Sequence, residues 1–272
     1  MTIEPLLQIR QAVRSRNPLI HCITNPISIN DCANAVLAVG AQPIMAEHPQ
    51  EVAAITRGAA ALLVNLGNIT DTRLESMLVS GGEAHEHGIP CVIDLVGAGC
   101  SLLRLQFARK FVWNCQPAVI KGNLSELKAF AGTPSQAAGV DAGDRLTPEN
   151  TAKTLDQLAR LSRRTGAVVL ATGAVDIVTD GRQAVLLRNG VPLLSRITGT
   201  GCMVGVLTAV CLSGGDTFTA AVLAAATLGI AGELAAGTAH GTGSFRVSLL
   251  DALSTLDDET FAGRLRMETV PL

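Results

Sequence analysis

Between Arg196 and Cys211 the chain reads RITGTGCMVGVLTAVC, which places a Gly-Thr-Gly turn directly before an apolar run. A glycine-rich turn that leads into a helix presents free backbone N–H groups and a partial positive charge to an anion. Gly199 and Gly201 are therefore candidates for a phosphate-binding turn. The alternative is a tight turn that only lets a buried helix begin, and the spacing alone leaves both interpretations open.

Cys202 lies in the first turn of the helix that this motif predicts. A helix N-terminus lowers the pKa of a thiol below its usual value of about 8.5, which makes the sulfur more reactive. Cys202 is therefore a candidate catalytic residue. For an isolated cysteine, a buried structural thiol is the alternative.

Polar or charged residues also end three other apolar segments. Asp94 ends PCVID, directly before the glycine-rich LVGAG, and a carboxylate there suits Mg²⁺ held through water and phosphate. Lys121 follows PAVI and is placed to neutralise phosphate, and Thr172 ends AVVLAT. Glu126 lies three residues after Asn123, which is also the spacing of a helix capping box. For Asp94 the alternative is a loop hydrogen bond, and for Lys121 it is a solvated side chain. For Thr172 the alternative is an ordinary turn, and for Glu126 it is helix capping.

Several other classes of site are excluded by motif or composition. No Gly-Lys pair is present, so there is no P-loop, and the glycine motif lacks the third glycine of a dinucleotide fingerprint. A net charge of −2 and only 3% aromatic residues argue against nucleic-acid binding. Seven cysteines without a C-x-x-C pair exclude a zinc ribbon or disulfide framework and indicate a reducing, cytoplasmic compartment.

A membrane span is the remaining alternative for the apolar C-terminal third. The apolar part of the first charge-free run, Cys202 to Leu212, has 11 residues. As a helix it would measure about 16 Å, against roughly 30 Å of hydrocarbon. We therefore expect two buried helices and no membrane contact. Since helices that are apolar all round need cover on every side, a subunit interface is also expected.

The elements that must position these residues alternate between short apolar strands and amphipathic helices. We expect strands at 19–24, 42–46, 61–67, 90–99, 117–123 and 167–173, with helices between them, including 48–57 and 147–164. Asp180-Gly181 predicts a hairpin turn, residues 132–146 a loop, and the rest of the C-terminal part is expected to be helical.

This order predicts an α/β fold in which a mainly parallel central sheet has helices on both faces and is followed by a helical C-terminal part. Ligands of such sheets bind beyond the carboxyl ends of the strands, which is where Asp94, Lys121 and Thr172 fall. No linker or internal repeat interrupts the pattern, so we expect one domain over residues 1–272.

Together these segments resemble the hydroxyethylthiazole kinase family of thiamine salvage, within the ribokinase-like superfamily. The specific segments are HCITNPISINDCANAVLAVGAQPIMAEHPQEV (His21–Val52) and ITGTGCM (Ile197–Met203). Four shorter segments support these two by their shared order and spacing: VNLG, VIDLVGAG, IKGNLSE and LATG. The resemblance covers nearly the whole chain.

The resemblance implies phosphorylation of the hydroxyl of 4-methyl-5-(2-hydroxyethyl)thiazole with ATP as co-substrate and Mg²⁺ as cofactor. It implies that Met45 and Gly199 contact the thiazole and that Lys121 and Thr172 contact ATP. The resemblance also implies that Asp94 and Glu126 are the acidic residues at the metal ion and the phosphates. It places Asn25 near the substrate and the phosphates. Cys202 stands where related sugar kinases carry a basic aspartate. The family forms homotrimers with active sites between subunits.

Two residues depart from the family pattern. Leu95 replaces a proline after Asp94, which is expected to loosen the loop there. Lys121 replaces an arginine, which keeps the charge but loses the bidentate fork. The competing hypotheses are a hydroxymethylpyrimidine or sugar kinase, an ATP-dependent hydrate dehydratase of this fold, and a non-catalytic ligand-binding trimer.

Overall fold

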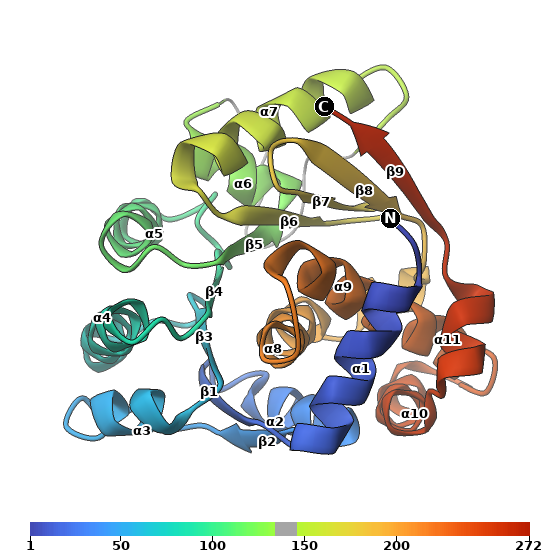
Figure 1. The fold of residues 1–272 in the computed structure, drawn as a ribbon, viewed down its shortest axis with the longest axis horizontal. Coiled ribbons are helices and arrows are strands. Elements are labelled where there is room, and N and C mark those ends of the chain that lie inside the picture. The colour runs from blue at the N-terminus through green and yellow to red at the C-terminus, as the bar shows by residue number, and fades with distance from the viewer. Residues whose placement is uncertain (134–145) are drawn as a thin grey trace.

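The computed structural model describes residues 1–133 and 146–272, and these ranges form one nine-stranded sheet with helices on both faces (Figure 1). The strand order across the sheet is β2 (Gln42–Ile44), β1 (Leu19–Ile23), β3 (Ala61–Asn65), β4 (Cys91–Asp94), β5 (Val119–Asn123), β6 (Val168–Thr172), β7 (Asp176–Thr179), β8 (Gln183–Leu187) and β9 (Met267–Pro271). Pairing is parallel from β2 to β6 and antiparallel from β6 to β9. The α/β fold with a mainly parallel sheet is confirmed.

Each face of the sheet has its own hydrophobic core. On one face lie α1 (Glu4–Arg16), α2 (Ile29–Ala38), α8 (Thr200–Leu212), α9 (Thr217–Ala236), α10 (Thr242–Thr255) and α11 (Asp258–Arg264). On the other lie α3 (Val52–Gly58), α4 (Asp71–Glu86), α5 (Leu102–Cys115), α6 (Leu124–Ala131) and α7 (Thr151–Thr165). A short 3₁₀ helix, η1 (Pro192–Arg196), leads from β8 toward α8.

Strand alternation decides which polar side chains face α8. In β3, Leu63 belongs to the α8-side core, whereas Leu62 and Val64 belong to the opposite core. Since successive side chains of a strand point to opposite faces, Asn65 shares the α8 side with Leu63. By the same alternation, Asp94 in β4 and Lys121 in β5 also face α8.

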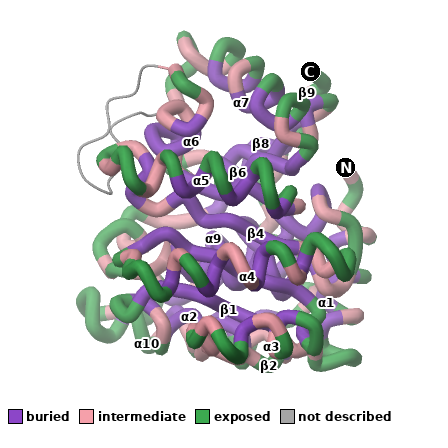
Figure 2. The backbone as a smooth tube through the Cα atoms, turned by 90° about the vertical axis from the view of Figure 1, so that its left-hand side faces the viewer, coloured by how far each residue is buried: buried purple, intermediate pink, exposed green. Residues whose placement is uncertain are grey.

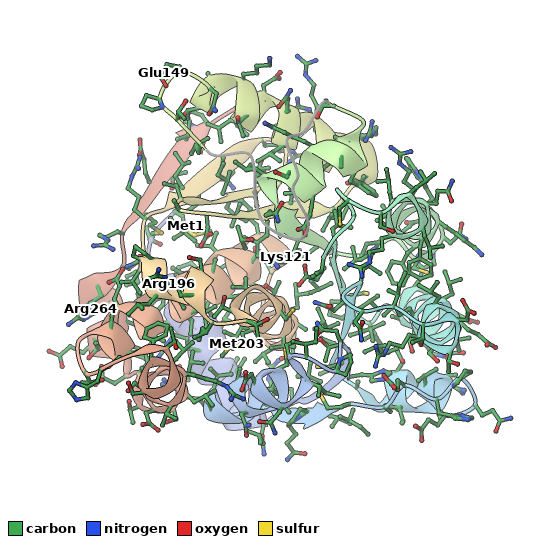
Figure 3. All side chains as sticks on the ribbon, turned by 180° about the vertical axis from the view of Figure 1, so that it is seen from behind. Met1, Lys121, Glu149, Arg196, Met203 and Arg264 are labelled. Atoms are coloured by element: carbon green, nitrogen blue, oxygen red, sulfur yellow. The ribbon has the colours of Figure 1, made fainter. Side chains whose placement is uncertain are left out.

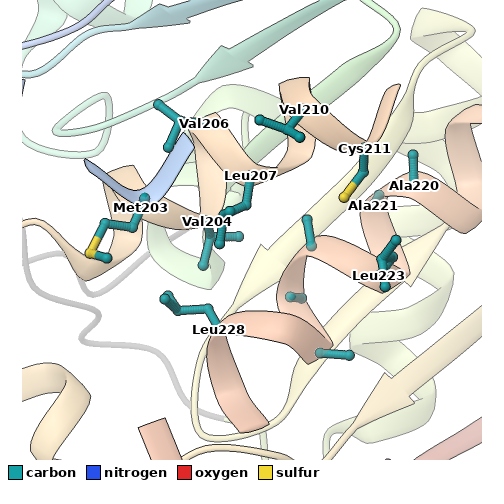
Figure 4. Packing of buried hydrophobic residues seen from close by; sticks show 14 of the residues in the cluster. Met203, Val204, Val206, Leu207, Val210, Cys211, Ala220, Ala221, Leu223 and Leu228 are labelled. Atoms are coloured by element: carbon teal, nitrogen blue, oxygen red, sulfur yellow. The ribbon is translucent and has the colours of Figure 1, made fainter. Parts of the chain in front are cut away.

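Helices α8 and α9 pack against each other and are covered by the chain itself (Figures 2 and 4). Every residue of α8 from Cys202 to Leu212 is buried. In α9, which is long and apolar enough to cross a membrane, 89% of the most apolar 18-residue window is buried inside the protein. These helices are therefore core helices, and their apolar surface gives no reason to expect a partner subunit.

The expected hairpin is confirmed. β7 and β8 pair antiparallel, and Gly181 between them adopts a positive φ of +85°. The side chain of Asp180 stabilises the turn, because its Oδ1 accepts the backbone N–H groups of Arg182 and Gln183.

Two kinds of sequence-based expectation need correction, and a third is not tested. The C-terminal part is not all helical, because Met267–Pro271 forms β9 and pairs with β8 at the sheet edge. Helices α3 and α7 begin at Val52 and Thr151, several residues later than expected, because turns precede them. Of the loop expected at residues 132–146, positions 134–145 lie outside the described ranges.

Candidate active site

The candidate site lies where the carboxyl ends of β1, β3, β4 and β5 meet the N-terminus of α8. Four strands that run in parallel deliver Asn25, Asn65, Asp94 and Lys121 to the same edge of the sheet. Helix α8 crosses this edge and brings Cys202 to the side chain of Asn25. Figure 3 shows Lys121 in the middle of the molecule, between β5 and α8.

Asp94 and Lys121 form a buried ion pair at the centre of the site. The side chains are 0% and 4% exposed, and Lys121 Nζ donates to Asp94 Oδ1 at 3.0 Å and to Oδ2 at 3.1 Å. Burial alone would lower the pKa of Lys121, but the adjacent carboxylates of Asp94 and Glu126 raise it above its ordinary value. Burial also raises the pKa of Asp94, although Lys121 and Asn65 lower it; because both of its oxygens accept hydrogen bonds, we describe the pair as an ammonium and a carboxylate.

Asn25 joins the strand ends to the helix. It is 4% exposed, and its Nδ2 donates to Asn65 Oδ1 at 3.0 Å and to the sulfur of Cys202 at 3.3 Å. Asn65 in turn donates to Asp94 Oδ2 at 2.9 Å. The five polar residues Asn25, Asn65, Asp94, Lys121 and Cys202 therefore form one connected cluster.

Glycines let the first turn of α8 approach this cluster closely. Gly199 caps the helix with φ +91°, and a Cβ on it would lie 2.9 Å from Cβ of Ser28. A Cβ on Gly201 would lie 3.4 Å from Lys121 Nζ, and one on Gly205 would lie 3.3 Å from Asp94 Oδ2. The free N–H groups and the positive dipole end of α8 thus lie at the same edge of the sheet as the Lys121 ammonium.

Glu126 serves both as a helix cap and as a charged group beside the cluster. It is the N3 residue of α6, and the expected capping box with Asn123 is confirmed. Its Oε2 accepts the N–H of Asn123 and its Oε1 that of Gly97, both at 2.8 Å. Burial raises the pKa of Glu126 to about 7, although Lys121 and these two N–H groups lower it.

The two remaining predicted residues lie at the ends of neighbouring strands, without a hydrogen bond to the cluster among the described residues. Thr172 ends β6, opposite Asn123, and its Oγ1 lies 3.5 Å from the carbonyl oxygen of Gly122. Met45 follows β2 and packs against the α8-side core. Both belong to the same parallel edge, on either side of the cluster.

His21 supports the segment that carries Met45. The imidazole is 0% exposed, with Nε2 at 3.0 Å from the carbonyl oxygen of Ala46 and Nδ1 at 2.9 Å from Thr56 Oγ1. Because a carbonyl only accepts, Nε2 carries the proton, and burial lowers the pKa of His21. His21 therefore fixes the backbone next to Met45.

The loop after Asp94 is held in place rather than loosened. Leu95 is buried, and its N–H donates to the carbonyl oxygen of Lys121 at 2.8 Å. A proline here would have no N–H to donate. The leucine therefore adds a hydrogen bond between the loop and β5 that a proline would lack.

Asn65 is the site residue that the sequence analysis missed. It is the only polar residue of β3, whose sequence is ALLVN, and it is fully buried. The same signal, a polar residue at the end of an apolar strand, identified Asp94. Applied to β3 as well, it would have pointed to Asn65.

The donor set around Asp94 and Glu126 fits Mg²⁺ held partly through water and phosphate. No group of three or more His, Cys, Asp or Glu side chains that could hold a metal is found within the described ranges. Mg²⁺ is commonly held by one or two carboxylates together with substrate phosphates. Glu126 keeps lone pairs beyond its two N–H bonds, whereas Asp94 already accepts three hydrogen bonds.

Comparisons with proteins of known structure agree with the fold. A hydroxyethylthiazole kinase from Pyrococcus horikoshii OT3 superposes with a TM-score of 0.89 at 33% identity, over 97% of this chain and 98% of that one. A ribokinase-like superfamily protein from Enterococcus faecalis V583 superposes with a TM-score of 0.62 at 11% identity, over 88% of each chain. The second likeness supports the ribokinase-like fold alone.

Sequence comparisons assign the family. Hydroxyethylthiazole kinase 2 of Clostridium botulinum (strain Hall) is 51% identical over 265 residues, which are 97% of this chain and 100% of that protein. A hydroxyethylthiazole kinase of Methanoculleus marisnigri is 43% identical over 94% of this chain and 91% of its own. The sequence profile of the hydroxyethylthiazole kinase family matches residues 10–259. The chain therefore belongs to the hydroxyethylthiazole kinase family.

Proposed function

We propose that this protein uses ATP to phosphorylate the hydroxyl group of 4-methyl-5-(2-hydroxyethyl)thiazole. The observation that carries the proposal is the buried Asp94–Lys121 pair beneath the N-terminus of α8, in a chain of this family. Cationic and N–H donor groups converge there on one edge of the sheet. That arrangement suits a group that gains negative charge during transfer.

The reaction is an in-line displacement at phosphorus. The thiazole hydroxyl oxygen forms a bond to the γ-phosphorus of ATP, and the bond from this phosphorus to the β–γ bridging oxygen breaks, so ADP leaves with the electron pair. The hydroxyl proton passes to a nearby base or to water. Positioning and charge stabilisation supply most of the rate enhancement in such a transfer.

The residues of the site divide this work. Lys121 and Thr172 contact ATP, and the N–H groups of the Gly199–Cys202 turn donate to the transferred phosphoryl group. Met45 and Gly199 contact the thiazole, and Asn25 lies between the thiazole and the phosphates. Asp94 and Glu126 would hold Mg²⁺, and when bound the cation supplies charge neutralisation between the phosphates.

Cys202 acts mainly as a positioning residue or weak base. Its sulfur accepts a hydrogen bond from Asn25, and a loose transition state needs little early removal of the hydroxyl proton. Cys202→Ala should therefore keep measurable turnover. A folded, ATP-binding Cys202→Ala and Cys202→Asp that both lack turnover would contradict this role.

The domain organisation, cellular location and oligomeric state of the enzyme are also part of the proposal. We propose one kinase domain over residues 1–272, because a single sheet runs from β1 to β9. All seven cysteines are free thiols, which supports a cytoplasmic location. We propose a homotrimer with shared active sites because the chain belongs to the hydroxyethylthiazole kinase family. A sedimentation mass of one or two chains would contradict the trimer.

A substrate panel tests the proposed activity. The protein is incubated with Mg-ATP and, separately, the thiazole alcohol, a hydroxymethylpyrimidine and a sugar, and ADP release is measured. We expect ADP release with the thiazole alcohol well above that with the other two alcohols. No ADP above background with the thiazole alcohol would overturn the proposal, and faster release with the pyrimidine or sugar would favour the competing kinases.

A further inference from the structure

Two buried amide side chains at the site have their orientations fixed by the backbone. Gly67 N donates to Asn65 Oδ1 at 2.9 Å, and the N–H groups of Ile27 and Ser28 donate to Asn25 Oδ1 at 3.2 and 3.1 Å. A backbone N–H is only a donor, so each of these contacts identifies the oxygen end of the amide. The NH₂ end of each side chain must therefore point the other way.

The fixed orientations determine the direction of every hydrogen bond that follows. Asn65 Nδ2 donates to Asp94 Oδ2 at 2.9 Å. Asn25 Nδ2 donates to Asn65 Oδ1 and to Cys202 Sγ, which uses both of its hydrogens. Asn65 therefore holds Asp94 as an acceptor, and Asn25 holds the sulfur of Cys202 as an acceptor.

A flip of the Asn65 amide would break this arrangement on both sides. It would place Nδ2 against the N–H of Gly67 and the NH₂ of Asn25, and Oδ1 against the Asp94 carboxylate. Gly67 lets the backbone approach both amides closely, because a Cβ on it would lie 2.8 Å from Asn25 Nδ2 and 2.9 Å from Asn65 Oδ1. Unpaired buried donors and facing acceptors are each costly, so one orientation persists.

We propose that Asn65 is a positioning residue for phosphoryl transfer. It fixes the rotation of the Asp94 carboxylate while Lys121 balances its charge, and through Asn25 it links that carboxylate to Cys202 at the N-terminus of α8. The inference rests on the proposed kinase activity and adds a residue that acts on the reacting groups only through Asp94 and Asn25. A carboxylate free to rotate would hold Mg-ATP without aligning it.

The test compares two asparagines that each donate to a carboxylate. Asn65→Asp places a second carboxylate against Asp94. Asn189→Asp makes the same change outside the site, because Asn189 is 7% exposed and its Nδ2 donates to Glu233 Oε1 at 3.1 Å. Both variants should lose stability through like-charge repulsion. Only Asn65→Asp should lose kcat, by on the order of 10- to 100-fold, which is the usual effect of removing a residue that orients a ligating group.

A second variant separates positioning from folding and from charge. Asn65→Leu has a similar size and removes all three hydrogen bonds without adding charge. Its folded fraction is measured by thermal unfolding, and its affinity for Mg²⁺ with a non-hydrolysable ATP analogue by calorimetry. We expect a folded protein with near wild-type affinity and a KM for ATP that changes little, while kcat falls.

The outcomes are distinguishable. Wild-type kcat in a folded Asn65→Leu or Asn65→Asp overturns the inference, and so does an equal loss of kcat in Asn189→Asp. An affinity loss that accounts for the whole effect overturns it as well, because Asn65 would then serve binding alone. If the wild-type protein releases no ADP with any alcohol of the panel, the proposed function itself fails.

Discussion

At the scale of single residues, the most consequential choice is the lysine at position 121. Its ammonium is buried against both oxygens of Asp94, in a site where family resemblance would place an arginine. A guanidinium would spread its charge over a planar fork, whereas the ammonium concentrates it on one nitrogen. Lys121 therefore neutralises Asp94 directly, and the buried pair contributes to the stability of the fold as well as to the charge of the site.

Removing this ammonium should destabilise the fold. Lys121→Met leaves the Asp94 carboxylate buried without its counter-ion, and breaking a buried pair in this way costs about 3–5 kcal/mol. Urea unfolding gives the change in the free energy of unfolding. The matched control is Arg160→Met, which removes an ion pair to Asp156 between side chains that are 72% and 49% exposed. That pair is worth about 0.3–0.5 kcal/mol. Equal effects of the two substitutions would contradict a buried, structural Asp94–Lys121 pair.

At the scale of elements, His21 connects three of them. It lies in β1, contacts Thr56 of α3 and hydrogen-bonds to Ala46 in the segment that follows β2. Because burial lowers the pKa of His21 below 6.5, the folded protein resists a proton that the unfolded chain accepts. The free energy of unfolding should therefore fall as the pH drops through and below 6.5.

The variant His21→Gln isolates this contribution. Glutamine keeps a donor for the Ala46 carbonyl and cannot take up a proton. We expect the stability of the wild type, measured by urea unfolding at pH 7.5 and at pH 5, to decrease more than that of the variant. His85→Gln removes an exposed imidazole and serves as the control. If the wild type and His21→Gln lose the same amount of stability between pH 7.5 and pH 5, then the pKa of His21 does not differ between the folded and unfolded states.

The elements also show what sequence reasoning could reach. Apolar runs that end in a polar residue, such as those before Asp94 and Lys121, were predicted as strands because burial on both faces leaves a continuous hydrophobic signal. The edge strand β9 was missed, because METVP is short, half exposed and ends in proline. The starts of α3 and α7 were predicted too early, because a proline signals a turn as readily as a first helical turn.

At the scale of the whole molecule, the site could be predicted only as separate residues. The sequence placed Asp94, Lys121 and Cys202 near strand or helix ends, and the family resemblance added Asn25. The parallel sheet brings all four together. The pairing of Lys121 with Asp94 depends on strand alternation and burial. No local pattern encodes that partner, and the same holds for the orientation of the Asn65 amide.

The distance along the chain between the joined parts of the site affects how the protein is made. Asn25 contacts Cys202 across 177 residues, so the cluster forms only after α8 leaves the ribosome. Between the end of β5 at Asn123 and the end of α8 at Leu212, 212 − 123 = 89 residues must be synthesised. At 5–20 residues per second this takes about 4–18 s. During that interval the central strands of the nascent chain lack the α8 cover of one apolar face, which makes that face a target for chaperones that bind exposed hydrophobic surface.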